Sequence, residues 1–141
     1  REEAVVKLPQ AMHVYNLRSG QALGKVSSFR TEIIPCRATF LALCPTEPRE
    51  ARISLDSETA SRGEVRTVSV QVPGASGLQA YRVRARCGET GLDWLEQNVL
   101  CGTEPAQFVI PVAYNDPTGD WTIEAKELFT GRVTTAKLTV E

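Results

Sequence analysis

The sequence has no excess of positive charge and no long apolar run. Its 16 lysines and arginines are balanced by 17 aspartates and glutamates, which leaves a formal net charge of -1. A nucleic-acid-binding domain usually carries a basic surface, and a membrane-spanning helix needs about 20 consecutive apolar residues. We therefore expect neither nucleic acid nor a membrane among the partners of this chain.

Residues that bind metals or act as nucleophiles are also scarce. The chain has a single histidine, His13, and its cysteines form no CxxC pair, so the ligand spacing of a zinc site is missing. It contains no GxSxG motif and no glycine-rich phosphate loop followed by lysine. We interpret His13 as a surface or hydrogen-bonded histidine. The sequence predicts no metal, no cofactor and no enzymatic activity.

The four cysteines fall into two groups along the chain. Cys36 and Cys44 bracket one apolar run; in a straight strand they lie about 26 Å apart at about 3.3 Å per residue. A disulfide needs Cα atoms within about 7 Å, so these two should not pair. Cys87 and Cys101 flank a predicted hairpin. A disulfide between them remains an open alternative to two free thiols.

Apolar and polar residues alternate along most of the chain. Val68, Val70 and Val72 share one face of a predicted strand, and the same period of two recurs in the runs around Phe108 and Trp121. Turn-forming residues separate these runs about every 8–12 residues, which is typical of a sandwich or barrel. We predict an all-β fold, an immunoglobulin-like antiparallel β-sandwich preceded by a four-strand β segment.

Two stretches depart from this alternation. Residues 38–44 are nearly all apolar, which predicts a strand covered on both faces. Residues 91–100, GLDWLEQNVL, could hold one turn of helix.

The segment PTEPRE at residues 45–50 contains two prolines and no apolar side chain besides them, and it is the best candidate linker. It separates a β segment, residues 1–46, from a sandwich, residues 50–141. The chain starts with arginine rather than methionine, and we interpret it as a piece of a longer polypeptide. In that parent protein the first segment either completes another sandwich or packs on this one. Because a four-strand fragment of this size is marginal alone, we expect it to dock on this sandwich.

An acidic stretch at residues 114–131, YNDPTGDWTIEAKELFTG, raises the question of calcium binding or acid–base chemistry. The spacing of an EF-hand loop is absent, and Asp116 belongs to a run of Asn, Asp, Pro and Gly that a tight turn requires. In the next strand, Trp121 should face the interior, whereas Glu124 lies on the other face and should point to water; the position of Glu127 is ambiguous. We favour a turn and a half-buried strand.

Two groups of side chains are candidates for binding. Arg82, Arg84 and Arg86 line one face of a strand, where they indicate a solvated face paired with glutamates across the sheet, or a contact with another domain. Trp94, beside two carboxylates in a loop, and Tyr114 are the candidates for stacking on a sugar ring. Filling the end of the sandwich is the alternative role for Trp94.

Two parts of the sequence resemble late segments of large bacterial glycosidase-like proteins. The strings YRVRARCGETG, NVLCGTEP and IPVAYNDPTGDW resemble an immunoglobulin-like module of β-galactosidase-type and trimerisation-domain-containing chains. The strings LPQAMHVYNLRSGQALG and IIPCRATFLALCP resemble the closing β-domain of glycosidases, with Cys36 where that family favours glycine. No catalytic residue belongs to either segment.

The resemblance implies a non-catalytic accessory module that serves domain spacing, docking or oligomer contact. Its partners are then other domains of the parent chain. Relatives of this kind are often exported, which implies an extracellular or periplasmic location. The alternative function is a carbohydrate-binding module that uses Trp94 or Tyr114.

Overall fold

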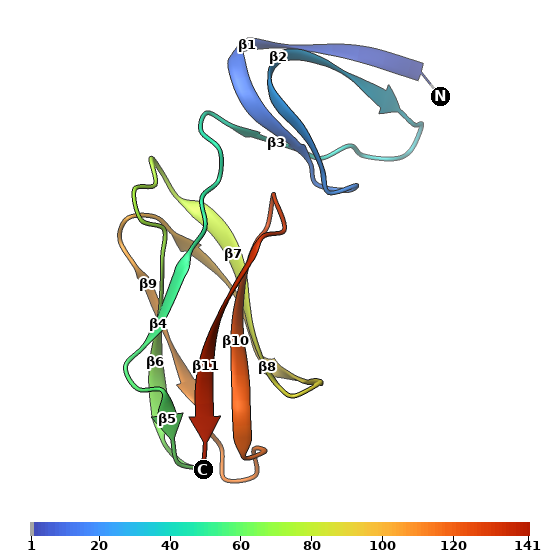
Figure 1. The fold of residues 1–141 in the computed structure, drawn as a ribbon. Helices are drawn as coiled ribbons and strands as arrows, with labels where there is room; N and C mark the ends of the chain where they lie inside the picture. The colour runs from blue at the N-terminus through green and yellow to red at the C-terminus, as the bar shows by residue number, and fades with distance from the viewer. Residues whose placement is uncertain (1) are drawn as a thin grey trace. The chain divides into compact units, whose positions relative to one another are not determined.

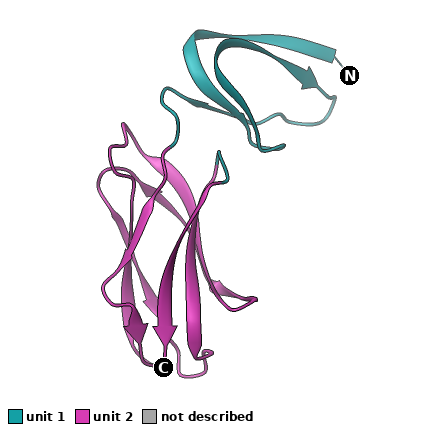
Figure 2. Cartoon of the chain, viewed as in Figure 1, with its two compact units in different colours: residues 1–48, 129–131 teal, residues 49–128, 132–141 magenta. Residues whose placement is uncertain are grey.

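The computed structural model describes residues 2–141, and these residues form strands and turns without a helix. Within them no helix is long and apolar enough to cross a membrane. The chain divides into two compact units (Figure 2), with residues 1–48 and 129–131 in unit 1 and residues 49–128 and 132–141 in unit 2. The division after residue 48 lies inside the PTEPRE segment. The all-β prediction is confirmed.

Unit 1 is a three-stranded antiparallel sheet in the order β2-β1-β3 (Figure 1), rather than the predicted four strands. Its strands are β1 (Glu2–Asn16), β2 (Gln21–Ile33) and β3 (Leu41–Cys44). The sequence shows two separate apolar runs here, AVVKL at residues 4–8 and AMHVYNL at residues 11–17. Both belong to the single strand β1, because the chain around Pro9 is accommodated where the β1–β2 register shifts between Lys7 and Met12. A bulge of this kind tolerates a proline that cannot donate to the ladder.

The apolar run at residues 38–44 is not covered on both faces, which corrects the prediction. Only its last four residues form β3, and of these Ala42 is buried. Phe40 and Leu43 stay 55% and 44% exposed. The sheet is small here, since β3 has four residues and pairs with only the last four residues of β1.

Unit 2 is a β-sandwich made of a three-stranded sheet, order β4-β6-β9, and a five-stranded sheet, order β5-β11-β10-β7-β8 (Figure 1). The strands are β4 (Arg52–Leu55), β5 (Thr59–Ala60), β6 (Val65–Gln71), β7 (Gln79–Cys87), β8 (Thr90–Cys101), β9 (Ala106–Pro111), β10 (Gly119–Glu127) and β11 (Val133–Val140). All pairs are antiparallel except β5 with β11. This confirms the predicted sandwich.

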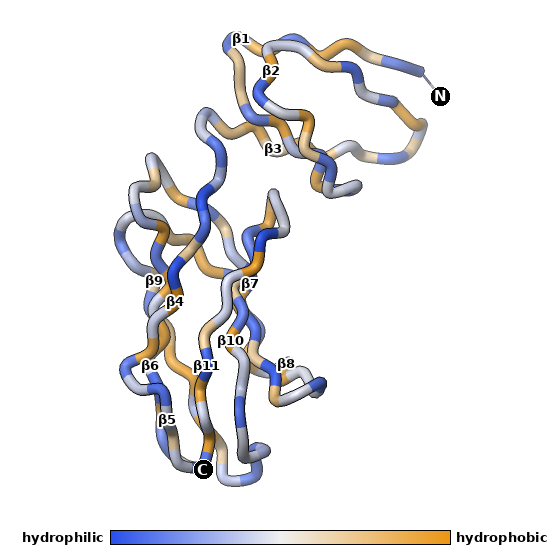
Figure 3. The backbone as a smooth tube through the Cα atoms, viewed as in Figure 1, coloured by the Kyte–Doolittle hydropathy of each residue, from blue (hydrophilic) through white to orange (hydrophobic). Residues whose placement is uncertain are grey.

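Alternating side chains build the core of the sandwich, and hydrophobic and hydrophilic residues alternate along its strands in Figure 3. Val68 and Val70 face inward from β6, and Trp121 and Ile123 face inward from β10; all four are fully buried. The indole nitrogen of Trp121 donates to the Pro117 carbonyl at 2.9 Å, so the large ring is buried without an unpaired polar atom. Trp121 lies in the interior as predicted.

Strand β7 fixes the first residue of unit 2. The Tyr81 hydroxyl donates to the Arg49 carbonyl at 2.5 Å, and the Arg49 amide donates to the side-chain oxygen of Gln79 at 2.8 Å. Tyr81 is buried, and burial raises the pKa of its hydroxyl, with the charges of nearby Cys101 and Glu127 adding to the rise. The neutral hydroxyl is therefore kept as a donor, and both backbone polar groups of Arg49 are bonded to one strand.

We expect Tyr81→Phe to lower the free energy of unfolding by about 1 kcal/mol, because it removes one buried hydrogen bond and keeps the ring. The measurement is urea unfolding followed by tryptophan fluorescence. Tyr114→Phe is the matched control, since this ring is 81% exposed, and it should change stability by less than about 0.5 kcal/mol. Equal effects of the two substitutions would contradict a role for the Tyr81–Arg49 bond.

Candidate functional site

The acidic stretch at residues 114–131 begins with a hydrogen-bonded turn. The Asp116 carboxylate accepts the Ala113 amide at 2.8 Å, and the Asp116 amide donates to the Ala113 carbonyl at 3.1 Å. Gly119 comes next at a φ of 115°, a backbone angle that favours glycine. Among residues 2–141, no three histidine, cysteine or acidic side chains gather to hold a metal ion. The carboxylate of Asp116 is buried because it closes this turn.

Glu124 is buried, although the sequence predicts that it points to water. It lies on the outer face of β10, but two arginines of β7 cover it: Nε of Arg84 is 2.8 Å from Oε2, and Nε of Arg86 is 2.9 Å from Oε1. Burial by itself raises the pKa of Glu124; the hydrogen bonds and charges of the arginines outweigh this and leave the pKa below its usual value. The carboxylate stays ionised between two cations.

The arginine row of β7 pairs with glutamates across the sheet. Arg84 faces Glu124 in the β7–β10 register, and Arg82 lies 3.6 Å from Glu96 of β8. The arginines are about half exposed, so these pairs join side chains at the surface and should contribute modestly to stability. The pairing predicted from the sequence is therefore observed.

Strand β8 contains a wide bulge at residues 93–96, within the stretch that the sequence indicated as a possible turn of helix. Val83 pairs with Gln97 and Ala85 pairs with Leu92, so residues 93–96 stand opposite the single residue Arg84. The bulge turns both Leu92 and Leu95 into the core, three residues apart. This spacing mimics a helix in the sequence, but the backbone remains paired with β7 on both sides of the bulge.

The same bulge places polar side chains around a shallow groove of about 360 Å³ on the outer face of unit 2. The lining includes Arg84, Arg86, Glu89, Asp93, Glu96 and Glu124. Trp94 lies in the bulge and is 61% exposed, so it does not fill the end of the sandwich. Trp94 itself does not line the groove, although Asp93 and Glu96 on either side of it in the bulge do.

Tyr114, the second candidate for sugar stacking, lies in the loop between β9 and β10 and is 81% exposed. The end of its ring lies against Gly63, where an added Cβ would come within 2.7 Å of Tyr114 Cζ and Oη. Gly63 also has a φ of 89°, a backbone angle that favours glycine. Glycine is therefore required at this position both for space beside Tyr114 and for the backbone conformation. Tyr114 comes from a different loop than Trp94 and does not line the groove.

Cys87 and Cys101 do not form the disulfide that the spacing left open. Cys87 pairs with Thr90 beside the β7–β8 turn, whereas Cys101 pairs with Gln79 at the other end of the hairpin. Eight residues of β7 separate these ends, about 26 Å at about 3.3 Å per residue. None of the four cysteines, which all lie within residues 2–141, forms a disulfide. Cys101 is buried, and burial raises the pKa of its thiol.

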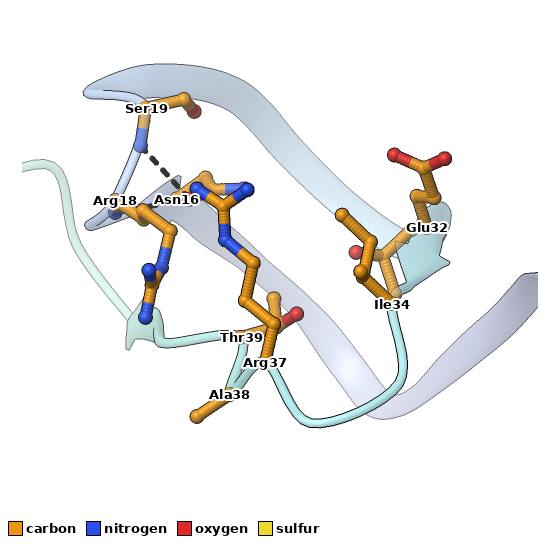
Figure 4. A pocket seen from close by; sticks show the side chains of 9 residues that line it. Asn16, Arg18, Ser19, Glu32, Ile34, Arg37, Ala38 and Thr39 are labelled. Atoms are coloured by element: carbon orange, nitrogen blue, oxygen red, sulfur yellow. Dashed lines mark hydrogen bonds between the residues drawn. The ribbon is translucent and has the colours of Figure 1, made fainter. Parts of the chain in front are cut away.

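Unit 1 contains a hollow of about 290 Å³ that sequence reasoning did not find (Figure 4). It is lined from the end of β1, the β1–β2 turn, the end of β2 and the connection to β3; the residues with polar or charged groups are Asn16, Arg18, Ser19, Thr31, Glu32, Arg37 and Thr39. In Figure 4, Arg18 and Ser19 lie on one side and Glu32 and Ile34 on the other, with Arg37 between them in this view.

A tight turn positions Arg37 at this hollow. The Arg37 amide donates to the Ile34 carbonyl at 3.1 Å, with Pro35 and Cys36 between them. Cys36 has a φ of 61°, as the third residue of a type II turn requires, and is the one non-glycine residue with positive φ among residues 2–141. The left-handed conformation costs roughly 1 kcal/mol for a side chain with a Cβ. Cys36, which stands where the resembling family favours glycine, is therefore a strained residue next to Arg37.

No family model and no curated protein matches the sequence. Weak structural neighbours include a β-glucosidase from Erythrobacter marinus, with a TM-score of 0.45 and 15% identity over 65% of this chain and 15% of that chain. A β-glucosidase from Listeria innocua in complex with glucose gives a TM-score of 0.42 and 12% identity over 64% and 16%. The CARDB domain of a Pyrococcus furiosus protein in complex with di-metal ions gives 0.40 and 17% over 65% and 88%.

We expect Glu124→Gln to lower the free energy of unfolding by about 1–2 kcal/mol at pH 7, because the variant loses the charge that both arginines bind. Folding lowers the pKa of Glu124. Its stabilisation is therefore present above the pKa of the unfolded chain, about 4.3, and is lost as the pH falls through the folded pKa.

The test is urea unfolding of both proteins between pH 7 and pH 3. The stability difference should shrink toward the acidic end. Glu89→Gln is the control, because Glu89 lines the same groove but is exposed. A difference between wild type and Glu124→Gln that is independent of pH would show that the substitution acts through packing and not through the carboxylate charge.

Proposed function

We propose that this chain is a non-catalytic accessory segment of a larger bacterial glycosidase-like protein, and that it serves domain spacing, docking or oligomer contact. The observation that carries this proposal is the path of the chain through unit 2. The polypeptide is fixed at Arg49 beside the start of β7, whereas β11 ends next to the start of β10, where Val140 pairs with Gly119. The start of β7 and the start of β10 lie at opposite ends of the sandwich, since Tyr81 pairs with Glu127 and Cys87 with Trp121.

A sandwich that the chain crosses from end to end separates the start of unit 2 at Arg49 from the end of β11. The first and last residues of the nine-residue strand β10 are eight positions, about 26 Å, apart at about 3.3 Å per residue. The core of unit 2 is closed around Trp121 and Tyr81, which are buried. A sandwich of this kind keeps its length without help from a neighbour. These features support a spacer.

Unit 1 supports the docking part of the proposal. Its sheet has three strands, and Val5, Ile33 and Phe40 are at least half exposed. Small sheets with one covered face are marginal by themselves, and exposed large apolar side chains on such a sheet favour contact with further protein. We infer that unit 1 is completed by other domains of the parent protein.

Hydrogen exchange of the intact chain tests this contrast between the units. We expect backbone amides of β1 and β2 in unit 1 to exchange at least about tenfold faster than those of β7 and β10, because a sheet without its covering layer opens at low free energy. The measurement is exchange followed by mass spectrometry of peptides from each unit.

The proposal fails if unit 1 is protected as strongly as β7 and β10. It also fails if the chain hydrolyses chromogenic glycosides and this turnover disappears in Glu124→Gln. The first result removes the need for a docking partner, and the second assigns chemistry to the carboxylate that we place in an ion-pair network.

A second candidate function, carbohydrate binding, is favoured by the exposed indole of Trp94 in the β8 bulge. Stacking of a sugar ring on a tryptophan needs an open aromatic face next to hydrogen-bonding groups. Asp93 and Glu96, which are one and two residues from Trp94 in the sequence, line the groove. Their carboxylates can accept hydrogen bonds from sugar hydroxyls.

If this second function holds, Trp94→Ala should weaken the affinity for neutral polysaccharide by about tenfold or more, which is the scale of one lost stacking contact. The measurement is the retardation of the chain in affinity electrophoresis on gels that contain the polysaccharide. Leu100→Ala is the matched control, because Leu100 lies on the same strand and is 63% exposed against 61% for Trp94. Unchanged retardation of both variants, or no retardation of wild type, would reject carbohydrate binding by Trp94.

A further inference from the structure

Two arginines of unit 1 reach one hollow from separate, ordered turns. The Asn16 side-chain oxygen accepts the amides of Arg18 and Ser19 at 3.0 and 3.2 Å, which fixes the β1–β2 turn. The Leu17 amide donates to the Phe40 carbonyl at 3.0 Å and ties that turn to the segment before β3. Arg37 closes the strained turn at Cys36. The backbone beside each arginine is therefore positioned before any ligand arrives.

The charges of these two arginines are not neutralised by the chain itself. Arg18 lies over the Phe40 ring at 5.9 Å, and within residues 2–141 neither Arg18 nor Arg37 forms an ion pair with a carboxylate. Arg84 and Arg86 of unit 2 differ, since both bind Glu124. Guanidinium groups that line one hollow without acidic partners form a site for an anion, above all a carboxylate or phosphate.

The remaining lining restricts which anion fits. Ser19, Thr31 and Thr39 supply hydroxyl groups, and Glu32 supplies a carboxylate. The negative charge of Glu32 disfavours a phosphate dianion, whereas its carboxylate oxygens can accept hydrogen bonds from hydroxyl groups of a ligand. Ile34 and Ala38 add apolar surface for carbon atoms of a ring. The volume, about 290 Å³, lies at the lower end of ligand sites, which suits a single ring.

We propose that the hollow of unit 1 binds a uronic acid, a sugar ring that carries one carboxylate. Arg18 and Arg37 hold the carboxylate, and Glu32 with the lining hydroxyl groups holds the ring hydroxyls. This site uses residues of unit 1 alone, and it is independent of the spacer role and of the exposed tryptophan in unit 2. If uronic acid binding fails its test, the spacer proposal is unaffected, and the reverse also holds.

The test is titration of the intact 141-residue chain with D-glucuronate and D-galacturonate, followed by NMR of backbone amides and arginine side chains. We expect saturable shifts at residues 16–19 and 31–39 for at least one uronic acid, at millimolar concentrations. D-glucose should bind at least about tenfold more weakly, because it lacks the charge that the guanidinium groups recognise.

Substitutions locate the site. Arg37→Gln and Arg18→Gln should each weaken uronic acid binding by about tenfold or more, since each removes a charge-assisted contact. Arg30→Gln is the matched control: Arg30 is an exposed arginine of β2 that pairs with Glu3 and lies outside the hollow, and its loss should leave binding unchanged. Arg18 and Arg37 are exposed, so the variants should keep the wild-type amide spectrum, which the same NMR data verify.

The remaining arms of the titration decide between ligand classes. Inorganic phosphate or N-acetylaspartate that binds the hollow more tightly than the uronic acids overturns the sugar assignment. Equal binding of glucose and glucuronate, or no shifts at residues 16–19 and 31–39 with any uronic acid, overturns the proposal itself. Equal weakening by Arg30→Gln and Arg37→Gln does the same, because the effect is then one of net charge.

Discussion

The antiparallel register of β7 and β10 is the constraint on which the sandwich of unit 2 depends. In this register Ile123 stands opposite Ala85 on the inner face, and one residue further Glu124 stands opposite Arg84 on the outer face. Since side chains alternate between faces, a shift by one residue would bring the arginines into the core and the apolar residues into water. The hydrophobic core and the ion pairs of Glu124 are therefore two consequences of the same pairing, and each disfavours the shift that would break the other.

The sequence was sufficient wherever a strand keeps its period of two. Trp121, Tyr81, Val68 and Val70 lie inside as the alternation predicts. The period was insufficient at the bulges. Leu92 and Leu95 are three residues apart and both buried, because β8 gains residues that β7 does not match. Similarly, Pro9 lies between two apolar runs of the sequence, but both runs and the proline belong to β1 in the structure. A bulge belongs to a pair of strands, and the pairing cannot be inferred from either strand alone.

The candidate sites were harder to predict for the same reason. The burial of Glu124 results from two arginines about 40 residues earlier in the chain, which its own strand does not reveal. The hollow of unit 1 combines the β1–β2 turn with the connection after β2, although a flat hairpin would place these at opposite ends. The register shifts in β1 allow the ribbon to bend (Figure 1), and the only local signal for the site was a cysteine in the place of a glycine.

The arginines of the two units show how partner geometry decides what a guanidinium group can do. On β7, Arg84 and Arg86 share one carboxylate, and they line a groove whose other charged residues are all acidic. An added anion would meet repulsion there, and the arginines contribute to the sheet. In unit 1 the hollow has two arginines against one glutamate, so an anion gains more attraction than repulsion. The strain at Cys36 fits this difference. A cysteine in the left-handed conformation is unfavourable for folding. The turn that contains Cys36 nevertheless places Arg37 at the hollow, where its charge can bind a ligand instead of pairing with a neighbouring strand.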